Sequence, residues 1–206
     1  MSLYEEYILP TVIHTTCGSK PILKQREKVV PLAEGRVLEV GMGSGINIPF
    51  YDPKKVDMVW GLEPSEGMRR KALKNLGKAP FDIQWIDLPS EEIPLDTNSA
   101  DTIVLTYTLC TIPNWQQALE EMRRVLKPQG MLLFCEHGEA PDKNIRRWQE
   151  RLNPIWKKLA GGCNLNRPIP SLLTESGFKI KKIETQYLPS TPKFAGFNYW
   201  GVSKIA

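Results

Sequence analysis

The order of apolar and polar positions divides most of the chain into short apolar runs and longer amphipathic stretches. The run at residues 102–106 contains no charged residue, which is typical of a strand covered on both faces. Such runs, alternating with stretches at helical spacing, predict parallel strands joined by helices. Strands are expected at residues 37–40, 57–62, 81–86, 101–107, 131–136, 178–183 and 199–204, and helices at 65–76, 114–126, 144–159 and 169–176.

Both ends of the chain depart from this alternation. Residues 3–30 mix apolar and charged positions at helical spacing around a break at 15–20, which predicts two helices before the sheet. The last two expected strands are joined by a loop, so they can pair antiparallel. We expect an α/β, Rossmann-like, doubly wound fold in one domain over residues 1–206, with residues 1–30 as an N-terminal helical lid.

Composition narrows the functional classes. No apolar stretch approaches the roughly 20 residues that span a bilayer, and the first residues lack a signal core, so we expect a cytoplasmic protein. A net charge of +4 without a block of like charges gives no reason to expect nucleic-acid binding. The cysteines form no Cys-x-x-Cys pair and are expected to be reduced; they are Cys17, Cys110, Cys135 and Cys163.

A glycine-rich loop follows the first expected strand. The segment Gly41-Met-Gly-Ser-Gly45 lies between that strand and an expected helix, where a doubly wound sheet places its nucleotide-binding loop. Glycine is needed there because a Cβ would block close approach of a ligand to the backbone. The pattern alone is weak, since a tight structural turn also explains it.

Two acidic residues, and the absence of a third glycine, indicate which cofactor the glycine loop binds. Glu39 ends the strand beside the loop, and Glu63 ends the next strand, where an acid can accept both hydroxyls of an adenosine ribose. Glu63 could instead be only a favourable charge at a helix N-terminus. The dinucleotide motif of a nicotinamide-dependent oxidoreductase requires a third glycine at position 46, where the loop meets the pyrophosphate of the cofactor. This chain has Ile46 at that position. S-adenosylmethionine has no pyrophosphate, and its cationic end suits a carboxylate such as Glu39, so the residues favour this cofactor.

With these residues in view, the chain resembles class I S-adenosylmethionine-dependent methyltransferases over nearly its whole length. The resemblance implies a seven-stranded sheet, mostly parallel with an antiparallel last strand. The segments that carry it are residues 37–45, 61–68, 93–101 and 118–131. The cofactor-binding residues expected from the loop, the acids and the resemblance are Glu39, Gly41, Gly43, Ser44, Gly45, Asn47, Glu63, Pro64, Met68, Asp87, Ser90, Glu91 and Thr106.

The chain departs from the family at one cofactor contact. In many relatives an Asp five residues before the proline of the third segment contacts the adenine amine, but counting back from Pro94 gives Pro89, which has no side-chain acceptor. The adenine is then expected to be held by the backbone near Ser90 and Glu91. Asp87 could replace the missing Asp only if the loop is shifted.

Further segments resemble one branch of the class. Phe134-Cys-Glu-His137 and parts of 147–166 are similar to thiol methyltransferases and to bacterial relatives once labelled phospholipid or quinone methyltransferases. This implies a small or lipophilic acceptor, a thiol among them. Methyl transfer from a sulfonium needs positioning and desolvation rather than a catalytic triad. The candidate catalytic residues are His137 as a general base, with Tyr107 and Cys110 near the acceptor.

Other roles stay open for several of these residues. Cys110 could be an ordinary buried thiol, and Cys17, Cys110 and Cys163 could bind a soft metalloid, as in arsenite methyltransferases, although the flanking pattern of that family is absent and no metal is expected. Trp148 and Trp156, predicted to face one way, could line an acceptor pocket or pack in the core. Three arginines could coat a solvated helix face or meet an anionic substrate or a membrane surface; they are Arg146, Arg147 and Arg151.

Three functional hypotheses therefore differ in class. The first is a methyltransferase with a small acceptor and S-adenosylhomocysteine as its product. The second is a non-catalytic S-adenosylmethionine-binding protein with the same cavity. The third is the nicotinamide-dependent oxidoreductase.

Overall fold

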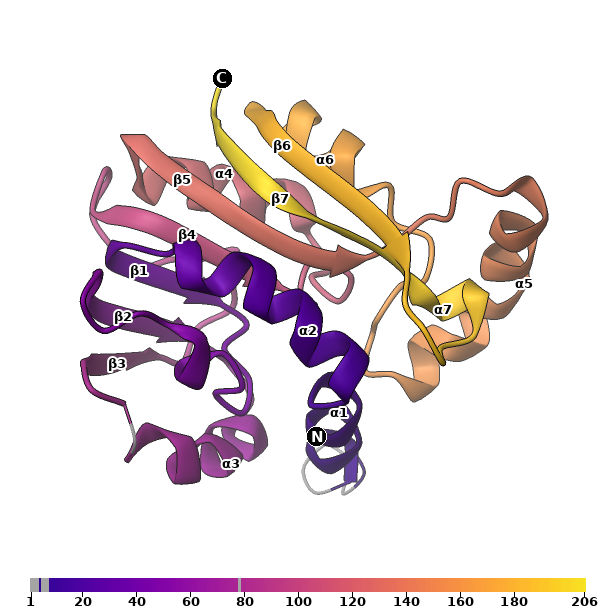
Figure 1. Ribbon diagram of the computed structural model, residues 1–206, viewed down its shortest axis with the longest axis horizontal. Helices are drawn as coiled ribbons and strands as arrows, with labels where there is room; N and C mark the ends of the chain where they lie inside the picture. The colour runs from indigo at the N-terminus through magenta and orange to yellow at the C-terminus, as the bar shows by residue number, and fades with distance from the viewer. Residues whose placement is uncertain (1–3, 5–7, 78) are drawn as a thin grey trace.

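The computed structural model describes residues 4, 8–77 and 79–206, and within these it forms a seven-stranded sheet (Figure 1) in the order β3-β2-β1-β4-β5-β7-β6. Strands β1 to β5 pair in parallel, and β7 is antiparallel to both of its neighbours, β5 and β6. The predicted doubly wound sheet with an antiparallel last strand is confirmed. The strands are β1 Gly35–Val40, β2 Val56–Leu62, β3 Asp82–Ile86, β4 Ala100–Thr106, β5 Leu126–His137, β6 Phe178–Tyr187 and β7 Phe197–Ile205.

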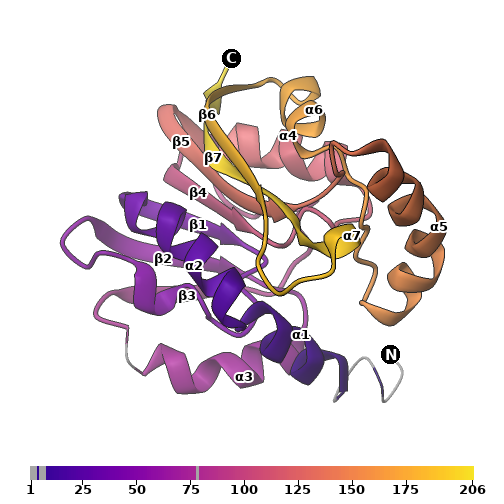
Figure 2. The same ribbon diagram turned by 45° about the vertical axis from the view of Figure 1, so that its right-hand side comes forward.

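Helices cover both faces of the sheet. In Figures 1 and 2, α2 lies across one face and α4 and α6 lie against the other, while α5 lies beyond the carboxyl end of β5. The helix α1 extends from α2 toward α3. The α-helices are α1 Leu9–Cys17, α2 Lys20–Val29, α3 Glu66–Leu76, α4 Trp115–Val125, α5 Lys143–Leu159, α6 Ile169–Glu175 and α7 Lys193–Gly196.

Two apolar cores hold these layers together. Val37 and Leu38 are neighbours on β1, yet they belong to different cores, because successive strand residues point to opposite faces. Leu38 packs in the core that includes Met122 of α4 and Leu173 of α6. Val37 packs in the core that includes Val29 of α2. This double burial explains the continuous apolar runs in the sequence.

Local signals set several helix ends. Ser65 precedes α3 and its hydroxyl accepts a hydrogen bond from the backbone N–H of Met68 at 3.3 Å, as an N-cap does. The side chain of Asn114 caps α4 in the same way. The two helices predicted within residues 3–30 are found as α1 and α2, whereas residues 3 and 5–7 of that prediction lie outside the described residues.

Two predictions about local structure were wrong. No α-helix begins directly after the glycine loop; the chain makes only a 3₁₀ turn at Ile48–Phe50, where Pro49 has no N–H to continue a helix. Trp148 and Trp156 do not share one environment, since Trp148 is 55% exposed and Trp156 packs against Phe194. Eight residues turn a helix roughly 80° beyond two full turns, enough to separate two side chains.

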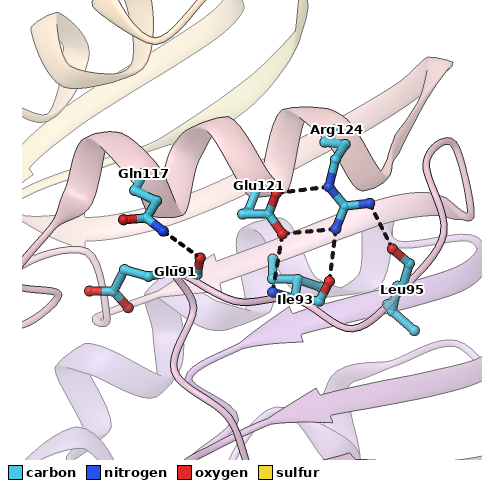
Figure 3. A network of polar contacts seen from close by, with 6 residues as sticks. All are labelled: Glu91, Ile93, Leu95, Gln117, Glu121 and Arg124. Carbon is cyan, nitrogen blue, oxygen red and sulfur yellow. Dashed lines mark hydrogen bonds and ion pairs between the residues drawn. The ribbon is translucent and has the colours of Figure 1, made fainter.

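The connection between β3 and β4 is fastened to α4 (Figure 3). Glu121 accepts from the backbone N–H of Ile93 at 3.2 Å and pairs with Arg124 at 2.7 Å. Arg124 in turn donates to the carbonyl of Ile93, and Gln117 donates to the carbonyl of Glu91. These bonds fix the backbone of a segment that the resemblance places near the adenine.

Within the described part of the chain, the helices are too short or too polar to span a bilayer.

Candidate functional site

A cavity of about 250 Å³ opens at the carboxyl ends of β1, β2 and β4. A doubly wound sheet binds its ligands at this edge. The walls come from α1 and α2, the glycine loop, the start of α3 and the segment after β4. The lining residues are Leu9, Pro10, Ile13, Cys17, Arg26, Gly41, Met42, Gly43, Ser44, Ile46, Glu63, Ser65, Met68, Thr106, Tyr107, Thr108, Thr111 and Gly161.

The glycines of the loop adopt a left-handed backbone conformation, which costs other residue types conformational free energy. Gly41, Gly43 and Gly45 have φ of +69°, +60° and +71°, in the left-handed region. A Cβ on Gly41 would lie 2.3 Å from two side-chain atoms of Thr108. The first two glycines line the cavity, so the loop presents bare backbone to it.

Replacing Gly41 with alanine is expected to destabilise the fold by about 1–3 kcal/mol, because the new Cβ combines a left-handed backbone with a clash. Thermal unfolding should show a melting temperature lower by several degrees. Gly77→Ala is the matched control, since nothing lies within 4 Å of a Cβ there and φ is not positive. Equal melting temperatures for the two variants would contradict this account of the loop.

Glu63 joins β2 to the glycine loop. One carboxylate oxygen accepts from the backbone N–H of Gly43 at 3.0 Å and the other from that of Ser65 at 2.8 Å. The side chain is 8% exposed and lines the cavity. Burial raises the pKa of Glu63, while the two backbone N–H groups oppose the change. A carboxylate fixed in this way keeps acceptor capacity directed toward the cavity.

A buried polar network lies beneath the loop. Arg26 donates to the side-chain oxygens of Asn47 at 2.8 Å and Thr106 at 2.6 Å. Asn47 donates to Glu39 at 2.9 Å, and the Tyr51 hydroxyl donates to the other oxygen of Glu39 at 2.7 Å. The network therefore links α2 to β1 and β4 under the cavity floor.

This network holds the Glu39 carboxylate, which was expected to meet the cationic end of the cofactor. The carboxylate is 1% exposed, does not line the cavity, and uses both oxygens on Asn47 and Tyr51. Burial raises the pKa of Glu39 to about 7 against the effect of its hydrogen bonds and of Arg26. Direct contact of Glu39 with a cationic ligand stays a prediction, whereas its contact with Asn47 is a structural fact.

The other expected cofactor contacts divide into two groups. Six of them line the cavity: Gly41, Gly43, Ser44, Glu63, Met68 and Thr106. The other expected contacts do not line the cavity. Gly45 packs toward Ile48, Asn47 is wholly buried, and Pro64 lies between the lining residues Glu63 and Ser65. Asp87 is exposed beside Trp85, and the side chains of Ser90 and Glu91 are bonded to each other.

Tyr107 lies at the cavity in an unusual conformation. Its φ is +53°, its hydroxyl bonds to Asn198 of β7 at 2.5 Å, and its ring lies 5.1 Å from the Arg26 guanidinium carbon. Burial raises the pKa of the phenol well above its ordinary range. A left-handed tyrosine costs free energy and persists where its surroundings require it.

His137 and Cys110, two of the candidate catalytic residues, meet Cys163 beside the cavity. His137 Nε2 lies 3.1 Å from the Cys163 sulfur, and the two sulfurs lie 3.5 Å apart. Contact with Cys110 and the nearby His137 lowers the pKa of the Cys163 thiol below its ordinary range despite burial. Burial alone would lower the pKa of His137, but the charges of Cys163 and Glu136 raise it. The structure thus groups Cys110 and Cys163 with His137, whereas the thiol site that the sequence left open combined them with Cys17.

Glu136 is a wholly buried carboxyl beside this cluster. It accepts from the backbone N–H groups of Thr108 and Leu109 at 2.7 and 3.0 Å, and burial raises its pKa from 4.5 to about 7. Between these pH values the native state holds a proton that the unfolded chain releases. The stability that this proton provides is complete below about pH 4.5 and is lost as the pH rises to about 7.

We expect Glu136→Gln to gain stability relative to the original chain as the pH rises through that window, by at most about 3 kcal/mol. The glutamine oxygen can accept the same backbone bonds and carries no charge to desolvate. Chemical unfolding at several pH values from 4 to 8 measures the difference. A difference that stays constant over this range would show that Glu136 does not titrate as inferred.

Sequence reasoning missed Arg26, and it named Cys163 only in a possible thiol site with Cys17 and Cys110. Arg26 lies on the apolar face of α2, where residues 22, 23, 29 and 30 are apolar neighbours at helical spacing. A charge at the centre of an apolar face could have marked it, because buried charges require partners. Cys163 has no local signal of this kind, since only the tertiary fold brings its loop to His137.

Comparisons with known proteins agree with this geometry. A family model described as a methyltransferase domain matches residues 38–134. The thiol S-methyltransferase TMT1B of Homo sapiens is 32% identical over 176 residues, covering 80% of this chain and 71% of that protein. The TMT1B protein of Rattus norvegicus is 31% identical over 170 residues, covering 79% and 70%.

Solved structures share the fold. A S-adenosylmethionine-dependent methyltransferase of Leishmania major superimposes with a TM-score of 0.71 at 18% identity, covering 98% of this chain and 80% of that chain. A possible histamine N-methyltransferase of Thermotoga maritima gives a TM-score of 0.66 at 20% identity, covering 98% and 97%. Together with the strand order and the glycine loop at the end of β1, these matches show that the chain belongs to the class I S-adenosylmethionine-dependent methyltransferases.

Proposed function

We propose that this chain transfers the methyl group of S-adenosylmethionine to the sulfur of a small thiol. The observation that carries the choice of thiol is the 30–32% identity to proteins named thiol S-methyltransferases over three quarters or more of the chain. The cavity supports it with a buried cation and apolar residues of α1 around the space where an acceptor would approach.

The cavity fits the cofactor at the ribose end. A Cβ built on Gly43 would lie 3.1 Å from Met68 Cε and 4.0 Å from a Glu63 oxygen. The loop therefore leaves room where a side chain would otherwise stand. We assign Glu63 to the ribose hydroxyls, because its carboxylate is fixed by backbone bonds and directed to this space.

Arg26 fits the opposite, amino-acid end. It is 5% exposed, lines the cavity, and its Nε makes no hydrogen bond to any described residue. A buried guanidinium with an unused donor is suited to a carboxylate. We assign Arg26 to the carboxylate of the methionine part, with Asn47 and Thr106 holding the guanidinium in place.

At the adenine end of the cofactor, we expect contacts with backbone groups rather than with side chains. The Ser90 hydroxyl bonds to Glu91, whose carboxylate also accepts from the N–H of Asn114. These side chains are thus engaged away from a ligand, while the main chain around them is fixed to α4 (Figure 3). We retain the sequence-based proposal that backbone groups near Ser90 and Glu91 hold the adenine, without Asp87.

Bound in this way, S-adenosylmethionine supplies a methyl group on a sulfonium, and the residues around it position the acceptor. Leu9, Pro10 and Ile13 of α1 cover the cavity and keep water from the reacting sulfur. His14 Nδ1 lies 2.6 Å from the Ser44 hydroxyl, which ties α1 to the glycine loop. We propose that α1 is the part of the N-terminal segment that acts as a lid.

Deprotonation of the acceptor is assigned to its surroundings. A thiol must react as a thiolate, and the positive charge of Arg26 in the cavity wall favours that form. A general base role for His137 stays a prediction, with its Nε2 at present directed to Cys163. Cytoplasmic location and membrane contact through Arg146, Arg147 and Arg151 stay predictions as well.

The test is a matched acceptor series. An alkyl thiol, the corresponding alcohol and the corresponding amine are incubated with methyl-labelled S-adenosylmethionine, and labelled products are identified by mass spectrometry. We expect product from the thiol alone and none with Glu63→Ala. Methylation of the alcohol or the amine instead would refute the thiol assignment, and no transfer to any acceptor would favour the non-catalytic binding protein.

A further inference from the structure

Three side chains able to bind a metal ion converge next to the cavity. Cys110 follows β4, His137 ends β5, and Cys163 lies in the loop after α5. Their ligand atoms all lie within 4.8 Å of one another, with 3.1 Å from His137 Nε2 to the Cys163 sulfur and 3.5 Å between the sulfurs. Three segments distant in sequence thus direct two sulfurs and one imidazole nitrogen to a common point.

The scaffold around this point is fixed independently of the sulfurs. Asn164 donates to the carbonyl of Cys110 from both its backbone N–H, at 2.9 Å, and its side chain, at 2.8 Å. Arg167 donates to the carbonyls of Leu109 and Ile112, each at 2.6 Å. The loop carrying Cys163 is therefore fastened to the loop carrying Cys110, and the ligand atoms are held near one another before any ion arrives.

We propose that Cys110, His137 and Cys163 form a binding site for a zinc ion. Zinc binds thiolate at about 2.3 Å and imidazole at about 2.0–2.1 Å in tetrahedral geometry. These lengths place bound sulfurs roughly 3.8 Å apart and a sulfur and nitrogen roughly 3.6 Å apart. The His137–Cys163 and Cys110–Cys163 spacings in the structure are shorter by a few tenths of an ångström, and the His137–Cys110 spacing is at most 4.8 Å. Small movements of these side chains therefore admit the ion.

The donor set selects the kind of metal. Thiolate and imidazole favour zinc and other soft or borderline ions over magnesium and calcium, which prefer oxygen. Binding requires both sulfurs as thiolates and His137 neutral, and the released protons pass to solvent. Two thiolates then balance the charge of a divalent ion in a partly buried place. In this site His137 is a ligand rather than the general base expected from the sequence.

Three protein ligands leave a fourth position open, as in catalytic zinc sites. Thr111 follows Cys110 directly and Gly161 precedes Cys163 by two residues, and both line the cavity. A small thiol entering from the cavity could take the open position, release its proton to solvent and be held there as a thiolate. This consequence rests on the proposed thiol acceptor, whereas metal binding itself does not.

The experiment measures metal rather than activity. The whole chain is purified with a chelator, reduced with a phosphine, and titrated with Zn²⁺ against a chromophoric chelator, and separately with Co²⁺ while its absorption spectrum is recorded. We expect one equivalent of each ion and a cobalt spectrum with thiolate-to-metal charge-transfer bands. Cys110→Ser, Cys163→Ser and His137→Gln should each weaken binding by about 100-fold or more, since loss of mere supporting partners already costs 10–100-fold.

Cys135→Ala is the matched control, because Cys135 is a buried thiol on β5 outside the cluster, and it should keep the full affinity. Circular dichroism of every variant separates loss of metal from loss of fold. The proposal is overturned if folded, reduced protein binds no Zn²⁺ at micromolar concentrations, or if Cys110→Ser and Cys163→Ser bind as well as Cys135→Ala. Failure of the thiol methylation assay alone would leave these readouts unchanged.

Discussion

Replacing Glu63 with alanine is expected to lower the affinity for S-adenosylhomocysteine by about 100-fold or more. Two hydrogen bonds from the ribose hydroxyls to a buried carboxylate would be lost, and each such bond to a charged group contributes about 1.5–3 kcal/mol. 5′-Methylthioadenosine has the same ribose and no amino-acid part, so its affinity should fall to a similar extent. Titration calorimetry measures both ligands.

The control for this variant is Glu66→Ala. Glu66 is three residues further along the chain, its side chain is 68% exposed, and it does not line the cavity. It should bind both ligands like the original chain. Thermal unfolding of Glu63→Ala checks that the glycine loop, which Glu63 also bonds, remains folded. An affinity within about threefold of the original for both ligands would remove Glu63 from the cofactor site.

Replacing Arg26 with glutamine is expected to change the affinities for the same two ligands to different extents. S-Adenosylhomocysteine carries the carboxylate assigned to Arg26, and loss of a charge-assisted bond should weaken it by about 10–100-fold. 5′-Methylthioadenosine lacks the carboxylate, so its affinity should change by less than about threefold. Arg26→Lys keeps the positive charge and should restore part of the loss. The ratio of the two dissociation constants is the measured quantity.

Lys24→Gln is the matched control, because it removes one positive charge from the exposed side of the same helix. It should leave both affinities unchanged. If Arg26→Gln weakens both ligands equally, Arg26 acts only by supporting the fold through Asn47 and Thr106. If the substitution lowers the affinity for neither ligand, the amino-acid part of the cofactor binds away from Arg26.

The sheet could be predicted because the apolar runs of its buried strands recur along the sequence, separated by amphipathic stretches. Strands covered on both faces must be apolar throughout, and the caps at Ser65 and Asn114 mark helix starts locally. The turn after the glycine loop was missed because the helix expected there from a doubly wound sheet outweighed Pro49, which interrupts one. The environments of Trp148 and Trp156 depend on the neighbours of α5, and spacing alone does not supply these.

The site was predictable only in part, for a similar reason. The glycines and Glu63 are marked in the sequence by their positions at strand ends, whereas the hydrogen bonds of Glu39 to Asn47 and Tyr51, and its absence from the cavity lining, depend on the fold. Arg26 and Cys163 enter from segments far apart in sequence, α2 and the loop after α5. Their roles depend on tertiary packing, which no short motif encodes.

A crystal structure of the whole chain with S-adenosylhomocysteine tests the central claim most directly. The account predicts the ligand in the cavity at the ends of β1, β2 and β4, with its ribose hydroxyls on Glu63 and its carboxylate on Arg26. The homocysteine sulfur should then face the space bounded by α1 and Tyr107. A ligand bound outside this cavity, or one whose ribose makes no contact with Glu63, would contradict the account.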